Sequence, residues 1–356
     1  MRNAIGLVLV FSLGLAVACQ SDADVETGVD TEIRGGTDTN APPGPHGTDP
    51  TAPPDTAGTD DATPVVPDTS NPDTVAPDTS VPDTAALDTS GNGDTDSHSE
   101  ADTGEPQGSA GCGIASPMQS GTFSVTANNK ERTFVVDVPQ NYDGNRPHRL
   151  FFTWHWLGGN ASDVVNLGYY GIKAESDGSA IFVSPQGLGG GGDGTTGWWN
   201  ANGEDVQFLD EMMQRLLNNL CIDPQRVFST GFSFGGMMSN TIGCQRSSVF
   251  RAIAPMAGNL MGRCTNNDAV PIAFFGVHGD ADSGVTTQSG RDARDIIVAR
   301  NHCRDETRPA GGSFPDYCIE YEGCDAGYPV FWCEFPGEHQ LWFGSGKHLW
   351  NFFSRF

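Results

Sequence analysis

A short glycine-rich stretch places a serine where it could act as a nucleophile. It reads Gly231-Phe232-Ser233-Phe234-Gly235-Gly236 and lies between the strand-like run 226–230 and the helix-like run 237–244. A serine on such a sharp strand-to-helix turn holds its hydroxyl exposed above the edge of a sheet. The glycines two positions before and after it remove Cβ atoms that would collide in the turn. We therefore predict that Ser233 is a nucleophile, with a purely structural glycine turn as the alternative.

A nucleophilic serine needs a base to take its proton and an acid to orient that base. In hydrolases built on this turn, the chain order is serine, then aspartate or glutamate, then histidine. Asp280 and Asp282 both follow the strand-like run 271–277, where the acid belongs. His339 follows the strand-like run 329–335, where the base belongs. The pattern predicts Ser-His-Asp chemistry and leaves both aspartates open as the acid.

The negative charge that develops on an attacked carbonyl oxygen needs backbone N–H groups to bind it. Phe234, directly after the serine, is expected to supply one of them. The second is expected from Trp156 or Leu157, in the glycine turn that follows the buried run 149–154. The side chain of His155, in the same turn, is expected to be a hydrogen-bonded core histidine.

Four aromatic side chains are candidates for contact with a substrate, namely Trp198, Trp199, Tyr170 and Trp342. The two adjacent tryptophans follow the glycine-rich run 189–197, which is expected to form a loop over the site. Aromatic walls suit a planar phenolic acyl group or a sugar ring. The alternative is that Trp198 and Trp199 only anchor this loop to the core.

Strand-like and helix-like segments alternate from residue 121 onward. Besides the runs named above, residues 132–138, 180–184 and 251–256 are apolar and rich in strand-forming residues. Residues 204–220 form the clearest helix, because their apolar side chains recur on one face, and 291–301 and 347–353 are weaker candidates. This alternation predicts an α/β fold with a mainly parallel sheet covered by helices on both faces.

These motifs resemble those of a known enzyme group. The turn 231–236, the His278-Gly279-x-x-Asp282 turn and the Gly337-Glu338-His339 loop are similar to those of secreted feruloyl esterases and polyhydroxybutyrate depolymerases, which are α/β-hydrolases related to acetylxylan esterases. Residues 155–159, 168–171, 184–187, 203–206, 227–231 and 350–353 resemble the feruloyl esterase branch in particular. The resemblance covers residues 112–356. It implies a single α/β-hydrolase domain with Ser233 as nucleophile, Asp282 rather than Asp280 as acid, and His339 as base.

The chain departs from this group at two positions. Trp156 stands where many relatives have a glycine after the histidine, and Glu338 stands where a glycine often precedes the base. Both positions lie beside predicted site residues. The substrate preference within the group is therefore left open by the sequence.

Most of the acidic excess lies in the N-terminal part of the chain. The 356 residues include 45 acidic and 19 basic side chains, for a formal net charge of −26. Residues 20–108 hold 20 acidic residues, one arginine, no aromatic residue and repeated Pro-Asp-Thr triplets, a composition that cannot form a packed core. Residues 19–108 are therefore predicted to be a disordered linker and residues 109–356 the catalytic domain. Such acidity argues against a nucleic-acid partner.

The first 18 residues have the pattern of an export signal, with a basic start, the apolar run 4–17 and small residues before Cys19. The apolar run is short for a membrane span. Residues 16–18 fit an ordinary cleavage site, and residues 15–19 resemble a bacterial lipobox in which Cys19 carries a lipid. Cysteine parity favours the lipid, because removing Cys19 leaves an even number of cysteines.

The remaining eight cysteines are expected to form four disulfides in an exported chain, with the pairing open. They are Cys112, Cys221, Cys244, Cys264, Cys303, Cys318, Cys324 and Cys333. The spacing of Cys318 and Cys324 fits no common zinc-finger pattern, so we expect no metal site.

Taken together, the sequence predicts an exported serine ester hydrolase that works without a cofactor. The favoured substrate is a hydroxycinnamoyl ester on plant polysaccharide, and the runners-up are a polyester such as polyhydroxybutyrate or a short-chain acyl ester. A non-catalytic binding protein on a hydrolase scaffold is the alternative of another class. We expect a monomer, secreted or held at a bacterial surface through Cys19, that contacts the membrane only through that anchor.

Overall fold

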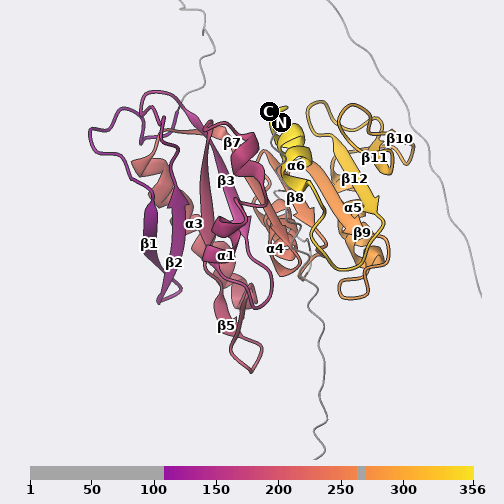
Figure 1. The fold of residues 1–356 in the computed structure, drawn as a ribbon, viewed down its shortest axis with the longest axis horizontal. Helices are drawn as coiled ribbons and strands as arrows, with labels where there is room; N and C mark the ends of the chain where they lie inside the picture. The colour runs from indigo at the N-terminus through magenta and orange to yellow at the C-terminus, as the bar shows by residue number, and fades with distance from the viewer. Residues whose placement is uncertain (1–107, 263, 265–268) are drawn as a thin grey trace, which may run out of the picture. The chain divides into compact units, whose positions relative to one another are not determined.

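A mixed sheet of ten strands organises the part of the chain that the structure describes. The structure is a computed structural model, and it describes residues 108–262, 264 and 269–356. The strands lie in the order β1-β2-β4-β3-β7-β8-β9-β12-β11-β10. Six neighbours, from β4 to β12, are parallel, and antiparallel strands extend the sheet at both ends (Figure 1).

The strands are β1 Gly121–Ala127, β2 Lys130–Asp137, β3 His148–Trp154, β4 Ala180–Pro185, β5 Leu188–Gly190, β6 Thr195–Gly197, β7 Ile222–Phe232, β8 Ala252–Met256, β9 Ala273–Gly279, β10 Thr307–Pro309, β11 Cys318–Tyr321 and β12 Val330–Phe335. The helices are α1 Ala161–Asn166, α2 Ile172–Glu175, the 3-10 turn η1 Ala201–Gly203, α3 Glu204–Asn219, α4 Phe234–Gln245, α5 Thr287–Arg300 and α6 Ser345–Phe353. Strands β5 and β6 form a separate hairpin after β4.

Side chains alternate between two cores, one on each face of the sheet. In β3, Leu150 and Phe152 belong to one core, whereas Phe151 belongs to the other. The first core is completed by apolar residues of α3, α4 and α5, and the second by residues of α1, α2 and α6. Because both faces are covered, the buried runs of the central strands are mostly apolar, which is why they were recognisable in the sequence.

The predicted strands and long helices are present, and the α/β fold with a mainly parallel sheet is confirmed. The largest difference in length is in β7, which begins at Ile222 instead of residue 226 and ends at Phe232 instead of residue 230. The pairing of β3 with β7 shifts between His148 and Leu150, so the residues around Pro224 form an irregularity in the strand. A proline cannot donate a ladder hydrogen bond, and the shift accommodates it.

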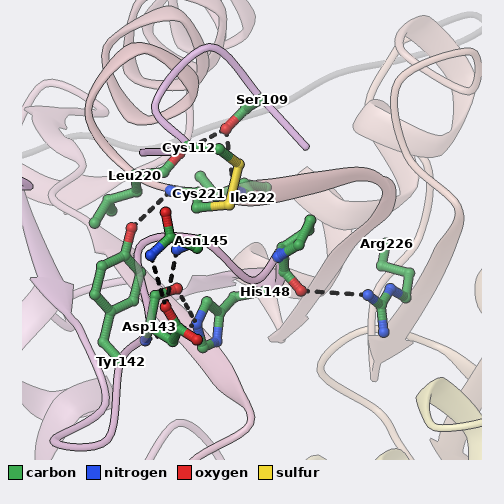
Figure 2. Close-up of a disulfide and its surroundings, with 11 residues drawn as sticks. Ser109, Cys112, Tyr142, Asp143, Asn145, His148, Leu220, Cys221, Ile222 and Arg226 are labelled. Carbon is green, nitrogen blue, oxygen red and sulfur yellow. Dashed lines mark hydrogen bonds between the residues drawn. A yellow bond between two sulfur atoms is a disulfide. The ribbon is translucent and has the colours of Figure 1, made fainter. Parts of the chain in front are cut away.

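Four disulfides join the eight predicted cysteines, which confirms the expected count. The pairs are Cys112–Cys221, Cys244–Cys264, Cys303–Cys324 and Cys318–Cys333. The first pair ties the start of the described chain to the connection between α3 and β7 (Figure 2). Beside it, the Ser109 hydroxyl donates to the carbonyl of Leu220 and accepts from the amide of Ile222.

Three predictions fall on the N-terminal part of the chain. The signal peptide 1–18, the lipid on Cys19 and the linker 19–108, except for its final residue, lie outside the described residues. Within the described residues, no helix is both long enough and apolar enough to span a bilayer.

Candidate active site

Ser233 lies on a strained turn between β7 and α4. Its backbone has φ of 56° and ψ of −119°, in a region that L-residues seldom adopt. The turn is closed by an amide hydrogen bond from Ser233 to the carbonyl of Met256. A Cβ on Gly231 would lie 2.5 Å from the backbone of Gly235, and one on Gly235 would lie 2.1 Å from the carbonyl oxygen of Trp154. Only glycine fits these two positions, as the sequence motif implied.

The structure brings Ser233, His339 and Asp282 into one hydrogen-bonded line. The Nε2 atom of His339 lies 2.8 Å from the Oγ atom of Ser233. Its Nδ1 atom lies 2.7 Å from the Oδ2 atom of Asp282. An ionised carboxylate only accepts hydrogen bonds, so Nδ1 carries the proton and Nε2 is left to accept the proton of Ser233.

The carboxylate of Asp282 is held by its own turn. Its Oδ1 atom accepts hydrogen bonds from the backbone amides of Gly284 and Val285, at 2.9 and 2.8 Å. The side chain is fully buried, and the Nε2 atom of His278 lies 3.3 Å from its Oδ2 atom. The same imidazole nitrogen lies 2.7 Å from the carbonyl oxygen of Val285, and this hydrogen bond holds the turn that contains Asp282.

Asp280 has a different position from Asp282. Its Oδ1 atom accepts a hydrogen bond from the backbone amide of Gly337, at 3.1 Å. Asp280 therefore connects the acid turn to the loop that carries His339, and its carboxylate makes no hydrogen bond with the imidazole. Glu338, the unusual neighbour of His339, is exposed.

The three side chains meet because their strands are neighbours. Ser233 follows β7, Asp282 follows β9 and His339 follows β12, and only β8 separates β7 from β9. Parallel strands end at the same edge of a sheet, so segments far apart in the sequence converge there (Figure 1). Strand β3, on the other side of β7, ends at the loop that contains Trp156 and Leu157.

The residues predicted to bind an oxyanion also lie at this edge. Phe234 is the first residue of α4, where backbone amides have no partner within the helix and the helix dipole is positive. The carbonyl oxygens of Trp154 and His155 pass within 3 Å of a Cβ placed on Gly235, so the β3 loop packs against the first turn of α4. The side chain of Leu157 is 48% exposed.

Three of the four aromatic candidates are buried, which corrects the prediction that they contact a substrate. Trp198 is fully buried, and its indole nitrogen donates to the carbonyl of His155. Tyr170 is buried beneath the nucleophile turn, with its hydroxyl donating to the carbonyl of Trp154. Trp342 is buried against other rings, and its indole donates to the hydroxyl of Tyr317. A local aromatic pattern does not reveal burial, because burial depends on the segments packed above it.

Trp199 is the candidate that remains at the surface. It is 39% exposed, and its ring meets that of Phe234 edge to face, with centroids 5.2 Å apart. The hairpin β5–β6 backs the indole, since a Cβ on Gly190 would lie 2.2 Å from its nitrogen. Gly197, at the end of the hairpin, contacts both Phe234 and Leu157. An apolar rim of Trp199, Phe234 and Leu157 therefore lies beside Ser233.

Comparison with known proteins decides the family. The chain is 36% identical over 270 residues to feruloyl esterase D of Neurospora crassa, which covers 70% of this chain and 90% of that protein. It is also 36% identical over 257 residues to feruloyl esterase C of Emericella nidulans, which covers 69% of this chain and 90% of that protein. This chain belongs to the feruloyl esterase family.

The other comparisons agree with this esterase fold. The prolyl oligopeptidase family matches residues 172–271, which include the nucleophile turn. An acetyl xylan esterase from Aspergillus awamori shares the fold, with a TM-score of 0.51 at 15% identity, over 65% of this chain and 99% of that one. The resemblance to feruloyl esterases and the α/β-hydrolase fold are thus confirmed, and the chain is a serine carboxylic-ester hydrolase.

Burial keeps two histidines near the site of this esterase neutral. Burial lowers the pKa of His278 below its ordinary value, although the hydrogen bond to Val285 and the charge of Asp282 oppose the shift. Burial likewise lowers the pKa of His155, against the hydrogen bond to Trp156. On the opposite edge of the sheet, burial lowers the pKa of His148 as well.

We predict that this esterase loses stability as the pH falls below about 6.5, the ordinary pKa of histidine. Below that pH the unfolded chain binds protons at these histidines, whereas the folded chain does not until its lower pKa values are reached. Each such histidine contributes up to about 1.4 kcal/mol per pH unit within that window. Urea unfolding at pH 7.5 and 5.5 measures the loss.

His148→Phe removes one of these buried groups, so its free energy of unfolding should depend less steeply on pH than that of the wild-type chain. The prediction would be contradicted if the free energy of unfolding of the wild-type chain stayed constant or rose when the pH was lowered from 7.5 to 5.5.

Proposed function

We propose that this chain is an exported feruloyl esterase that cleaves hydroxycinnamoyl esters of plant polysaccharide by an acyl-enzyme mechanism. The observation that carries the proposal is the line of hydrogen bonds from Ser233 through His339 to Asp282. The relatives are named feruloyl esterases, which supports a hydroxycinnamoyl group as the acyl part of the substrate. The exposed indole of Trp199 beside Phe234 supports a planar aromatic substrate.

In the proposed reaction, Ser233 attacks the ester carbonyl while the Nε2 atom of His339 takes its proton. Asp282 stabilises the imidazolium that forms, and the backbone amides of Phe234 and of Trp156 or Leu157 bind the oxyanion. His339 then returns the proton to the leaving alkoxide of the sugar. A water molecule, activated by the same imidazole, releases the acid and regenerates Ser233.

The setting of the enzyme is part of the proposal. Four disulfides favour an oxidising compartment, which agrees with export of residues 109–356 as the catalytic domain. We propose that residues 1–18 are removed, that Cys19 carries a lipid at the bacterial surface, and that residues 19–108 separate this anchor from the domain.

The first test is turnover of methyl ferulate, p-nitrophenyl acetate and polyhydroxybutyrate by the full chain. We expect methyl ferulate to be hydrolysed with the highest kcat/KM. Ser233→Ala should lower kcat by at least about 10⁴-fold, because the nucleophile is lost. Ser116→Ala, which changes an exposed serine outside the site, serves as control and should have no effect.

The panel of esters separates the alternatives. Clearing of polyhydroxybutyrate without release of ferulate would identify the enzyme as a depolymerase. A preference for the acetyl ester would identify it as a short-chain esterase. Turnover of none of the three would favour a binding protein on a hydrolase scaffold.

The second test compares the two aspartates. Asp282→Asn should lower kcat by about 10⁴-fold, since the amide cannot hold the imidazole in the required tautomer. Asp280→Asn should lower kcat by less than about tenfold, because the carbonyl oxygen of the new side-chain amide can still accept the Gly337 hydrogen bond. Steady-state kinetics of both variants on one ester give the comparison, and the reverse order of damage would assign the acid to Asp280.

The third test concerns the aromatic wall. Trp199→Ala should raise KM for methyl ferulate by roughly three- to tenfold, the loss expected for one ring contact of about 0.5–1.5 kcal/mol. The KM for p-nitrophenyl acetate should change less, because its acyl group is a single methyl. Trp199→Phe should restore most of the affinity for ferulate. Equal effects on both esters would remove Trp199 from the acyl-binding surface.

A further inference from the structure

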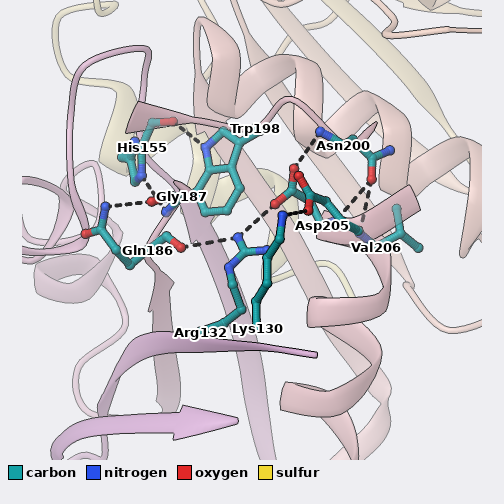
Figure 3. A network of polar contacts seen from close by, with 10 residues as sticks. Lys130, Arg132, His155, Gln186, Gly187, Trp198, Asn200, Asp205 and Val206 are labelled. Carbon is teal, nitrogen blue, oxygen red and sulfur yellow. Dashed lines mark hydrogen bonds and ion pairs between the residues drawn. The ribbon is translucent and has the colours of Figure 1, made fainter. Parts of the chain in front are cut away.

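His155 makes two hydrogen bonds that define its protonation. The backbone amide of Gly187 donates to its Nε2 atom at 2.9 Å, so that nitrogen carries no proton. The Nδ1 atom therefore carries the proton, and it donates to the carbonyl of Trp156 at 2.7 Å. The ring is fully buried, and Figure 3 shows it beside Gly187 and Trp198. Burial also lowers the pKa of His155, which preserves this neutral form.

The carbonyl of Trp156 belongs to the Trp156–Leu157 peptide group, which also contains the N–H of Leu157. This oxygen accepts from the Nδ1 atom of His155 and also from the amide of Gly159, at 3.0 Å. In a trans peptide the C=O and N–H bonds point in opposite directions. Because the oxygen points toward the buried imidazole, the N–H of Leu157 points away from it. Within the described part of the chain, neither this amide nor that of Trp156 donates to a backbone oxygen, so it is the orientation of the Trp156–Leu157 peptide that distinguishes the two.

His155 and the loop that follows it also contact the hairpin β5–β6 that supports Trp199. The indole of Trp198 donates to the carbonyl of His155, and the amide of Gly158 donates to the carbonyl of Thr196. A Cβ on Gly187 would lie 2.9 Å from Nε2 of His155 and 2.5 Å from the carbonyl oxygen of Gly197. The loop and the two ends of the hairpin are therefore packed as one unit.

A buried ion pair holds this unit to the sheet. The Nη2 atom of Arg132 lies 2.8 Å from the Oδ1 atom of Asp205, and both side chains are almost fully buried. The same nitrogen also donates to the carbonyl of Gln186 at 3.4 Å, next to Gly187 (Figure 3). The other oxygen of Asp205 accepts from the amide of Asn200, just after Trp199.

We propose that His155 is a positioning residue of the oxyanion hole, in which its Nδ1–H holds the Trp156–Leu157 peptide so that the amide of Leu157 faces the oxyanion. This inference rests on the proposed function, and it selects Leu157 over Trp156 as the second donor. Loss of one oxyanion donor costs about 10²- to 10³-fold in kcat. Loss of the residue that only orients a donor should cost less, roughly 10- to 100-fold.

The test replaces His155 by three residues in the full chain. Asn places an amide N–H near the position of Nδ1, Gln places an amide oxygen near the position of Nε2, and Phe retains the ring without either hydrogen bond. We expect kcat to fall by roughly 10- to 100-fold in His155→Phe and His155→Gln, with KM changed by less than about threefold. His155→Asn should keep most of the wild-type kcat, since it can still donate to Trp156.

The second readout is binding of a boronic acid, which forms a tetrahedral adduct with a nucleophilic serine. Its affinity should fall in His155→Phe by a factor similar to the fall in kcat, because adduct and transition state use the same amides. The matched control is His148→Phe, which removes another buried histidine bonded to loop backbone, at Asp143. This control should lose stability while its kcat and its boronic acid affinity stay at the wild-type values.

Three results would overturn the proposal. The first is a folded His155→Phe with kcat and boronic acid affinity within twofold of wild type. The second is a folded His155→Asn that is as impaired as His155→Gln, which would show that the bond to Trp156 is not the one that matters. The third is equal impairment of the control. If instead the wild-type chain turns over no ester and binds no boronic acid, the proposed function itself is wrong, a result distinct from the three above.

Discussion

The hydrogen bond between Asp282 and His339 is the interaction on which the site depends. It fixes the tautomer of the imidazole and thereby leaves a lone pair directed at Ser233. The bond exists because β9 and β12 are parallel neighbours, so the turns that follow them lie side by side. The acid turn adds two amide donors to the carboxylate, and Asp280 ties that turn to the loop of His339. Backbone geometry, more than side-chain length, therefore sets the alignment.

The other half of the site is built on a different principle. The loop after β3 contains no charged group at the reaction centre and is held by buried polar contacts that reach through His155 to Arg132 and Asp205. Such contacts are costly to break because the freed groups have no water to bond with. A chain of buried hydrogen bonds of this kind fixes the backbone of the loop, and under the proposed function that order would serve electrostatic catalysis.

Much of this architecture could be predicted because its signals are local. The buried runs of the central strands are mostly apolar, and the turn around Ser233 needs glycine at two positions, so both were visible in the sequence. The antiparallel strands β10 and β11 are short and carry polar residues, and they were missed. Asp280 and Asp282 could not be separated by chain position alone, since the turn between them decides which carboxylate faces the imidazole. The burial of Trp198 depends on a hairpin packed above it, which no local pattern encodes.

The Cys112–Cys221 disulfide determines how the domain would carry a mechanical load. Cys221 immediately precedes β7, which is bonded to β3 on one side and β8 on the other. Tension applied to the chain ahead of Cys112 therefore passes through the disulfide to the middle of the sheet. There it meets a strand that is hydrogen-bonded on both sides, whereas β1 is paired on one side only. Load that reaches Cys112 from the N-terminal side is thus transmitted to a central strand and not to the edge strand β1.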